Sequence, residues 1–109
     1  MTEERRNQYR DIFEERLLGE LHLHAEGRVV AVRHVEDISP FGISLLVDDF
    51  VATGSGITLR YQHGTIDVEV LGTVVWSAVV HAEDVARLGI NLQEGEMASN
   101  VTFFNAITA

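Results

Sequence analysis

Apolar and polar side chains alternate along most of this chain with a period of two, which is the pattern of β-strands that bury one face. Turn-forming residues interrupt the alternation at short intervals and divide it into separate strands. The strands that this pattern predicts span residues 20–24, 28–35, 43–47, 57–62, 66–70, 74–80 and 87–92. The clearest hairpin reverses at His63 and Gly64, and Gly72 is expected at a bulge or corner where a strand bends. Six or seven short strands with close turns predict an all-β fold, either an antiparallel barrel or a sandwich.

The two ends of the chain depart from the strand pattern. Met97, Val101 and Phe104 recur at helical spacing, so residues 93–109 are expected to form a short helix that covers the strands. Residues 1–16 are expected to form either an amphipathic helix or an arginine-rich arm that becomes ordered only with a ligand.

Size and composition bound the class of protein. At 109 residues, of which 46% are hydrophobic and 23% charged, the chain is large enough for one core. We therefore expect a single domain over residues 1–109, made of an arm (1–16), a barrel (17–92) and a C-terminal helix (93–109). The lack of cysteine excludes disulfides and thiolate metal sites. No apolar stretch approaches the ~20 residues of a membrane-spanning helix, and no signal-peptide pattern is seen, so a cytoplasmic protein without membrane insertion is expected.

The chain is acidic overall but has one cluster of basic residues. The net charge of −9 repels extended nucleic acid, which argues against DNA binding. All eight basic side chains are arginines, and three of them, Arg5, Arg6 and Arg10, lie within six positions. Arginine suits the bidentate recognition of phosphates and base edges better than lysine does. A compositional bias towards arginine explains the same cluster. A binding site can therefore be inferred only if a second, independent motif also points to one.

Two short motifs have chemistry that suits a guanine nucleotide. Arg6 and Arg10 form an R-x-x-x-R spacing, which on its own also fits a solvated helix face. Asp37, Ser39 and Gly42 form a D-x-S-x-x-G segment between two apolar strands. A carboxylate accepts two hydrogen bonds from the Watson–Crick edge of guanine, a hydroxyl donates to phosphate, and glycine permits a positive φ or a close backbone approach. An ordinary turn capped by Asp37 is the alternative interpretation.

In this order, the two motifs resemble those of the PilZ domain family, bacterial receptors for cyclic di-GMP. The resemblance covers residues 4–92 and includes four further segments, Gly27-Arg-Val-Val, Gly42-Ile-Ser-Leu, Gly72-Thr-Val-Val-Trp and Leu88-Gly-Ile-Asn-Leu. It implies a PilZ-type barrel on which Arg6 and Arg10 grip ligand phosphates and guanine Hoogsteen edges. It also implies that Asp37, Ser39 and Gly42 complete the binding site on the barrel surface.

Three other positions can be compared with the family pattern. Arg5 matches a position that is commonly basic in the family and is expected to help hold a second, stacked ligand molecule. Trp76 aligns with an aromatic residue near the site in some members, although a single tryptophan in an apolar strand more often belongs to the core. Thr73 is a departure, because many relatives carry arginine there, and the acidic flank of the arginine motif is another.

The resemblance implies a non-enzymatic receptor that binds cyclic di-GMP, uses no cofactor and changes conformation to regulate a protein partner. The candidates for this unidentified partner are motility, pilus and exopolysaccharide machinery. The alternative is a PilZ-like adaptor that acts through protein contacts without a nucleotide. Such relatives typically lack the arginine motif, so its presence favours the receptor.

Other polar clusters are weaker candidates. His22 and His24 lie on one strand face, and a metal site would require an adjacent strand to bring His34 beside them as a third ligand. Exposed alternation explains these histidines better, because no carboxylate is placed to complete a site, and no metal is expected. Two carboxylate pairs, Asp48 with Asp49 and Asp67 with Glu69, are assigned to turns or solvent faces rather than to acid–base catalysis. No nucleophile signature is present, so an enzyme is the least favoured class.

Overall fold

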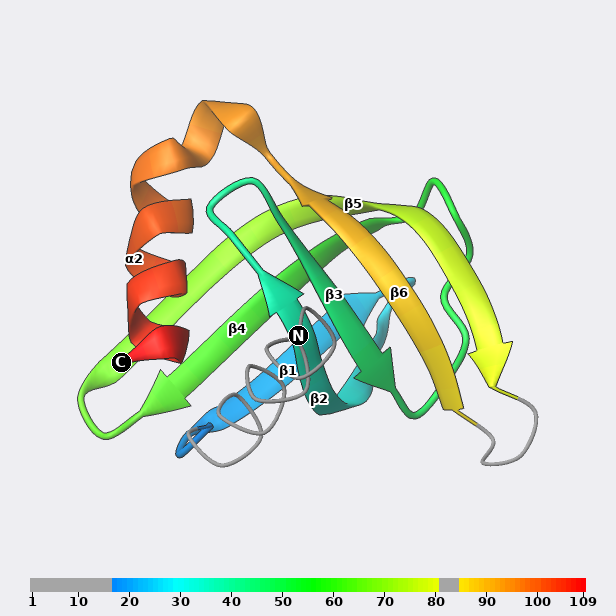
Figure 1. Ribbon diagram of the computed structural model, residues 1–109, viewed down its shortest axis with the longest axis horizontal. Coiled ribbons are helices and arrows are strands. Elements are labelled where there is room, and N and C mark those ends of the chain that lie inside the picture. Colours follow the sequence, from blue (N-terminus) through cyan, green and yellow to red (C-terminus); the bar gives the residue numbers. More distant parts are fainter. Residues whose placement is uncertain (1–16, 81–84) are drawn as a thin grey trace, which may run out of the picture.

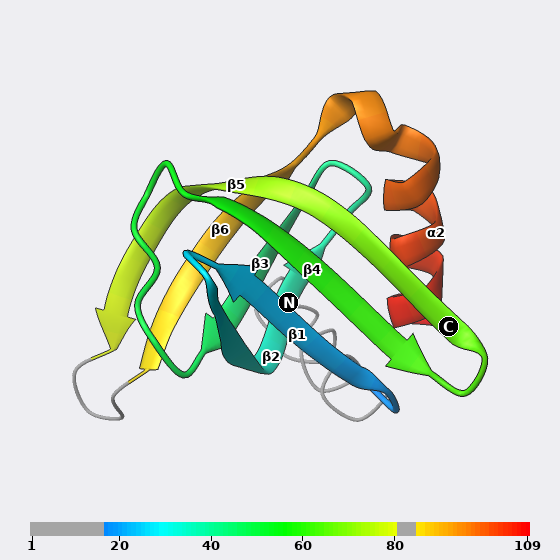
Figure 2. The same cartoon turned by 180° about the vertical axis from the view of Figure 1, so that it is seen from behind.

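The computed structural model describes residues 17–80 and 85–109 of the chain. Within these ranges six antiparallel strands form a closed barrel in the order β1-β2-β3-β6-β5-β4, and β4 pairs back to β1 (Figures 1 and 2). The strands are β1 (Glu20–Ala25), β2 (Arg28–Ile38), β3 (Gly42–Val47), β4 (Gly56–His63), β5 (Ile66–Val80) and β6 (Val85–Leu92). A short 3-10 turn, η1 (Glu94–Glu96), leads into the helix α2 (Met97–Thr108). The predicted all-β antiparallel barrel with a short C-terminal helix is confirmed.

The barrel closes because the inward-facing residues of β1 and β4 lie opposite one another. Leu23 pairs with Leu59 in the register of these strands, and buried residues alternate with more exposed ones on both sides of this pair. The largest fully buried strand side chains are Leu23, Val35, Leu45, Val47, Leu59, Val70, Val74, Val85 and Leu88. Each buried aliphatic side chain of this size contributes about 1.5–3 kcal/mol. The period-two pattern of the sequence is therefore the pattern of the core.

Strand β5 is long and curved, and of the two alternatives predicted for Gly72, a bulge or a corner, the bulge lies elsewhere, whereas β5 does pass from pairing with β4 to pairing with β6 at this glycine. The register with β6 shifts between Val74 and Trp76, so the extra residue is Val75 rather than Gly72. Gly72 has another role, because a Cβ atom there would lie 2.7 Å from the carbonyl oxygen of Asn91. The glycine thus permits a close approach to β6, while the bulge leaves both Val75 and Trp76 exposed on the outer face.

Helix α2 packs against β5 and β4, as expected of a helix that covers the strands (Figure 1). The buried residues are Asn100, Phe103 and Ile107, whereas Val101 is 39% exposed. Apolar residues occur on both sides of the helix, so helical spacing alone did not identify the buried side. Asn100 is buried because its Nδ2 atom donates a hydrogen bond of 2.9 Å to the carbonyl oxygen of Gln93, just after β6. Of the three residues at helical spacing, Phe104 packs against the core and Met97 is partly buried, whereas Val101 lies on the exposed side.

Helix α2 is too short to span a membrane. No helix among the residues that the structure describes is long and apolar enough to cross a bilayer.

We expect Phe103→Ala to lower the free energy of unfolding by about 3–5 kcal/mol, because it empties a fully buried aromatic site between α2 and the barrel. Val101→Ala on the exposed side of the same helix is the control and should change it by about 0.5 kcal/mol or less. Urea unfolding followed by circular dichroism measures both values. Equal losses in the two variants would show that the helix packs through a different face.

Candidate functional site

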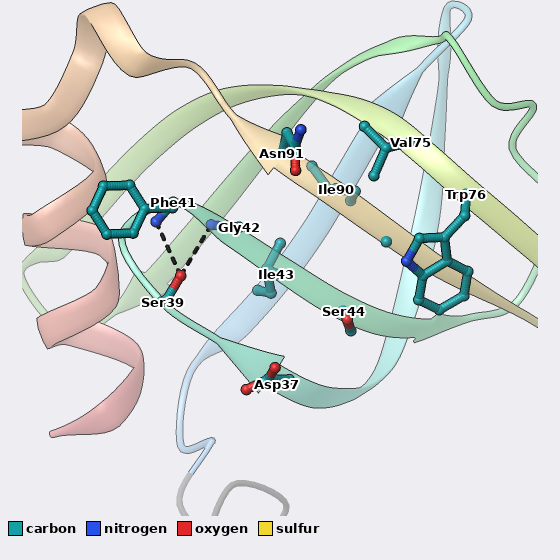
Figure 3. Close-up of a pocket in the computed structure, with 11 residues that line it drawn as sticks. Asp37, Ser39, Phe41, Gly42, Ile43, Ser44, Val75, Trp76, Ile90 and Asn91 are labelled. Atoms are coloured by element: carbon teal, nitrogen blue, oxygen red, sulfur yellow. Dashed lines mark hydrogen bonds between the residues drawn. The ribbon is translucent and has the colours of Figure 1, made fainter.

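The D-x-S-x-x-G segment forms the tight connection between β2 and β3. Ser39 and Gly42 pair at the base of this loop, with the Ser39 amide donating to the Gly42 carbonyl oxygen at 2.9 Å. The Ser39 Oγ atom accepts hydrogen bonds from the amides of Phe41 (3.1 Å) and Gly42 (3.2 Å), as Figure 3 shows. Both bonds use the hydroxyl oxygen as acceptor, so its hydrogen remains available for donation to a ligand.

Residue 42 is a glycine in a place where β6 passes too close for a side chain. A Cβ atom at this position would lie 2.9 Å from the carbonyl oxygen of Ile90. The loop is also tied to β6 directly, since the Leu92 amide donates to the Phe41 carbonyl oxygen at 2.9 Å. Of the two roles that the sequence allowed for this glycine, close approach is the one observed.

Four outward-facing positions lie in one row across the barrel surface. Asp37 on β2 pairs with Ser44 on β3, Ser44 pairs with Gly89 on β6, and Gly89 pairs with Trp76 on β5. We call these four residues the outer row. It brings Asp37 and Trp76, which lie far apart in the sequence, to opposite ends of one surface strip (Figure 3).

Trp76 lies over Gly89 and not in the core. The residue is 44% exposed, so the core interpretation of this single tryptophan is wrong. A Cβ atom at Gly89 would overlap three indole atoms, Nε1, Cε2 and Cδ1. The indole therefore rests on the bare backbone of Gly89, which is buried although it faces outward. One face of the ring system is supported by the barrel and the other side stays open to a ligand.

The outer row lies in a shallow pocket of about 290 Å³. The residues that line it are Asp37, Ser39, Phe41, Gly42, Ile43, Ser44, Val75, Trp76, Gly89, Ile90 and Asn91. Asp37 is the one charged residue among them, and no hydrogen bond or ion pair from the described part of the chain occupies its carboxylate. This pocket therefore offers hydrogen-bond acceptors, hydroxyls, an amide and an aromatic face, but no cation from its own lining.

The structure brings together four of the seven predicted site residues. Asp37, Ser39, Gly42 and Trp76 all line the pocket. Arg5, Arg6 and Arg10 lie outside the described residues. Ligand binding by all seven stays a prediction.

Sequence reasoning did not name the other seven lining residues as site residues, and Ser44, Gly89 and Asn91 are among them. Ser44 and Asn91 are polar positions within apolar strands, which is a signal for an outward-facing side chain but not for a site. Asn91 reaches the pocket because it pairs with Gly42, the last residue of the predicted motif. Strand order is needed to see this, and the period-two pattern carries no information about it.

The arginines in the described part of the chain are all engaged with carboxylates. The ion pairs join Arg28 to Asp49, Arg33 to Asp48, Arg60 to Asp67 and Arg87 to Glu36. None of these four arginines lines the pocket. An anionic ligand in the pocket would therefore need cations from another part of the chain or from a rearranged ion pair.

Three of the four carboxylates weighed for acid–base chemistry, Asp48, Asp49 and Asp67, lie in ion pairs with arginines. Asp67 accepts two hydrogen bonds from Arg60, at 2.9 and 2.7 Å. The hydrogen bond from the Arg60 guanidinium lowers the pKa of Asp67, and the same bond raises the pKa of Arg60. A general acid requires the opposite shift of a carboxyl pKa. Asp48 and Asp49 pair with arginines, as expected of turn residues.

The three histidines weighed as metal ligands, His22, His24 and His34, do not form a cluster. His22 and His24 pair with Ala31 and Val29 of β2, whereas His34 lies farther along β2, opposite Leu46 of β3. The arrangement in which an adjacent strand places His34 beside the other two, which was weighed and set aside in the sequence, does not occur. No group of three or more potential ligands among the described residues could hold a metal ion.

Comparison with known proteins gives one match. The family model of the PilZ domain matches residues 4–107, which include both sequence motifs, the barrel and most of α2. No curated protein matches the chain.

The contact between Trp76 and Gly89 can be tested by fluorescence, because the chain has a single tryptophan. We expect Gly89→Ala to displace the indole into water and shift its emission maximum to longer wavelength, since the added Cβ overlaps the ring. Gly56→Ala is the control, because a Cβ there meets nothing within 4 Å. An unchanged emission maximum in Gly89→Ala would contradict the described packing.

Proposed function

The chain belongs to the PilZ domain family, and from this membership we propose that it is a receptor for cyclic di-GMP. PilZ domains are ligand-binding modules for this nucleotide and not enzymes. For this chain the proposal covers the ligand, the residues that bind it and the regulation of a protein partner.

The observation that carries the proposal is the outer row. It spans three inter-strand steps, roughly 14 Å, which exceeds a single nucleobase and suits a ligand with two bases joined by a ring. Asp37 at one end has a carboxylate that can accept hydrogen bonds from N1 and N2 of guanine. Trp76 at the other end offers an exposed aromatic ring on which a purine can stack. Ser44 between them, and Ser39 in the adjoining loop, supply hydroxyls for phosphate oxygens.

The charge of the pocket suggests how the arginine motif takes part. Cyclic di-GMP carries two negative phosphates, while the pocket lining carries one carboxylate and no cation. Thr73, where many relatives carry arginine, lies opposite Asn91 at the edge of the pocket and adds no charge. We assign the missing cations to Arg6 and Arg10, because arginine–phosphate hydrogen bonds are charge-assisted and short.

In this mechanism the nucleotide connects two parts of the chain that lie on either side of β1 in sequence. Arg6 and Arg10 bind its phosphates and guanine Hoogsteen edges, and Arg5 holds a second, stacked molecule. Asp37 and Ser39 fix the ligand on the barrel. Binding draws residues 1–16 against the outer row and so changes the surface presented to a protein partner.

Titration calorimetry with cyclic di-GMP tests the ligand, with GTP as the control. We expect micromolar or tighter binding that GTP does not reproduce. Arg6→Ala and Arg10→Ala should each abolish measurable binding while circular dichroism and the unfolding midpoint stay unchanged. Retained affinity in both variants would refute the role of the motif. No heat from the wild type would favour the adaptor that acts without a nucleotide.

We expect Asp37→Ala to weaken binding about tenfold or more, because it removes charge-assisted hydrogen bonds to guanine. Asp67→Ala removes the same charge from the paired site on β4 and β5, away from the pocket, and is the matched control. The two dissociation constants are compared at one ionic strength. Equal affinities in the two variants would exclude a specific contact with Asp37.

A further inference from the structure

An ion pair between Arg87 and Glu36 lies beside the outer row. The Nε atom of Arg87 is 3.3 Å from Oε2 of Glu36. Arg87 lies two residues before Gly89 on β6, and Glu36 comes directly before Asp37 on β2. The two residues of the pair thus lie within two positions of pocket residues, on two different strands.

The strand register fixes which way these side chains face. Side chains two positions apart on a strand share a face and are roughly 7 Å apart, so Arg87 lies on the same outer surface as Gly89. Glu36 is the extra residue of a bulge in β2, because Val35 pairs with Leu45 and Asp37 pairs with Ser44. The bulge brings Glu36 within reach of Arg87 across the intervening strand β3.

The two charges differ in exposure in a way that matters for an anion. The Glu36 side chain is 20% exposed, whereas the other carboxylates in ion pairs are 44–63% exposed. A less hydrated charge acts more strongly on its neighbours. The Arg87 side chain is 50% exposed, so solvent and ligands can reach its guanidinium.

We propose that Arg87 is a further ligand-binding residue and that Glu36 competes with the nucleotide for it. The inference rests on the proposed binding of cyclic di-GMP to the outer row. Among the described arginines, Arg87 lies nearest in the register to Gly89 and Trp76. When the dianion occupies the row, the guanidinium turns from the Glu36 carboxylate to a phosphate oxygen or to O6 and N7 of guanine. Glu36 then stays beside the ligand as an unpaired anion and opposes binding.

This arrangement predicts that removing either residue of the ion pair changes the ligand affinity in opposite directions. Removing Glu36 frees Arg87 and deletes a repulsive charge, so affinity rises. Removing Arg87 deletes a ligand contact and leaves Glu36 unpaired beside the site, so affinity falls. A purely structural ion pair between β6 and β2 predicts lower stability in both variants and no opposed change in affinity.

The experiment uses the full chain and four near-isosteric variants. Glu36→Gln and Arg87→Gln test the pair beside the site, and Asp67→Asn and Arg60→Gln are the controls. The control pair joins β4 to β5 and does not line the pocket, so these substitutions make the same changes in net charge away from the ligand. Dissociation constants for cyclic di-GMP come from calorimetry, and urea midpoints report the stability of each variant.

We expect Glu36→Gln to bind at least about threefold more tightly than Asp67→Asn, and Arg87→Gln about tenfold more weakly than Arg60→Gln. If the wild type binds and each test variant equals its control, the competition is refuted while the proposed function stands. If neither the wild type nor Glu36→Gln binds, the proposed function fails and this inference fails with it. Binding by Glu36→Gln alone would support the competition directly.

Discussion

The close packing of β6 against its neighbours is the constraint on which the surface of this barrel depends. Gly42 and Gly72 face the backbone of Ile90 and Asn91, where a Cβ atom would meet carbonyl oxygens at 2.9 and 2.7 Å. Gly89 lies on β6 itself and is covered by the indole of Trp76. The lack of side chains at these three positions brings β3, β6 and β5 together and leaves a shallow hollow on the outer face. The same packing that completes the core therefore shapes the pocket.

The local features of this fold could be predicted from the sequence because they depend on neighbouring residues. The hairpin of β4 and β5 follows from two alternating runs around Gly64, which has a φ of 60°. The loop from Ser39 to Gly42 was recognised as a unit, and the structure places its motif residues in one pocket. What stays a prediction is that this pocket binds a nucleotide, since that depends on residues beyond the described ranges.

The features that could not be predicted depend on contacts between distant parts of the chain. Trp76 looks like a core residue in an apolar run, and only the bulge at Val75 and the bare backbone of Gly89 place it outside. The buried side of α2 does not follow from helical spacing, because it includes the polar residue Asn100, which donates to the carbonyl oxygen of Gln93. Asn91 joined the pocket through the pairing of β6 with β3. The positions of Trp76 and Asn91 depend on the strand order, about which a period of two carries no information.

Closure of the barrel has a consequence for how a protein partner can dock. A sheet with an open edge presents unpaired amides and carbonyls, to which another chain can add as an extra strand. Here β3 is paired on both sides along its length, and β1 joins β2 to β4. The first half of β5 pairs with β4 on one side, and α2 packs against β5. Where a strand is paired on both sides, as β3 is, recognition must therefore rely on side chains and surface shape, which a bound ligand can alter, and not on the addition of a strand to its backbone.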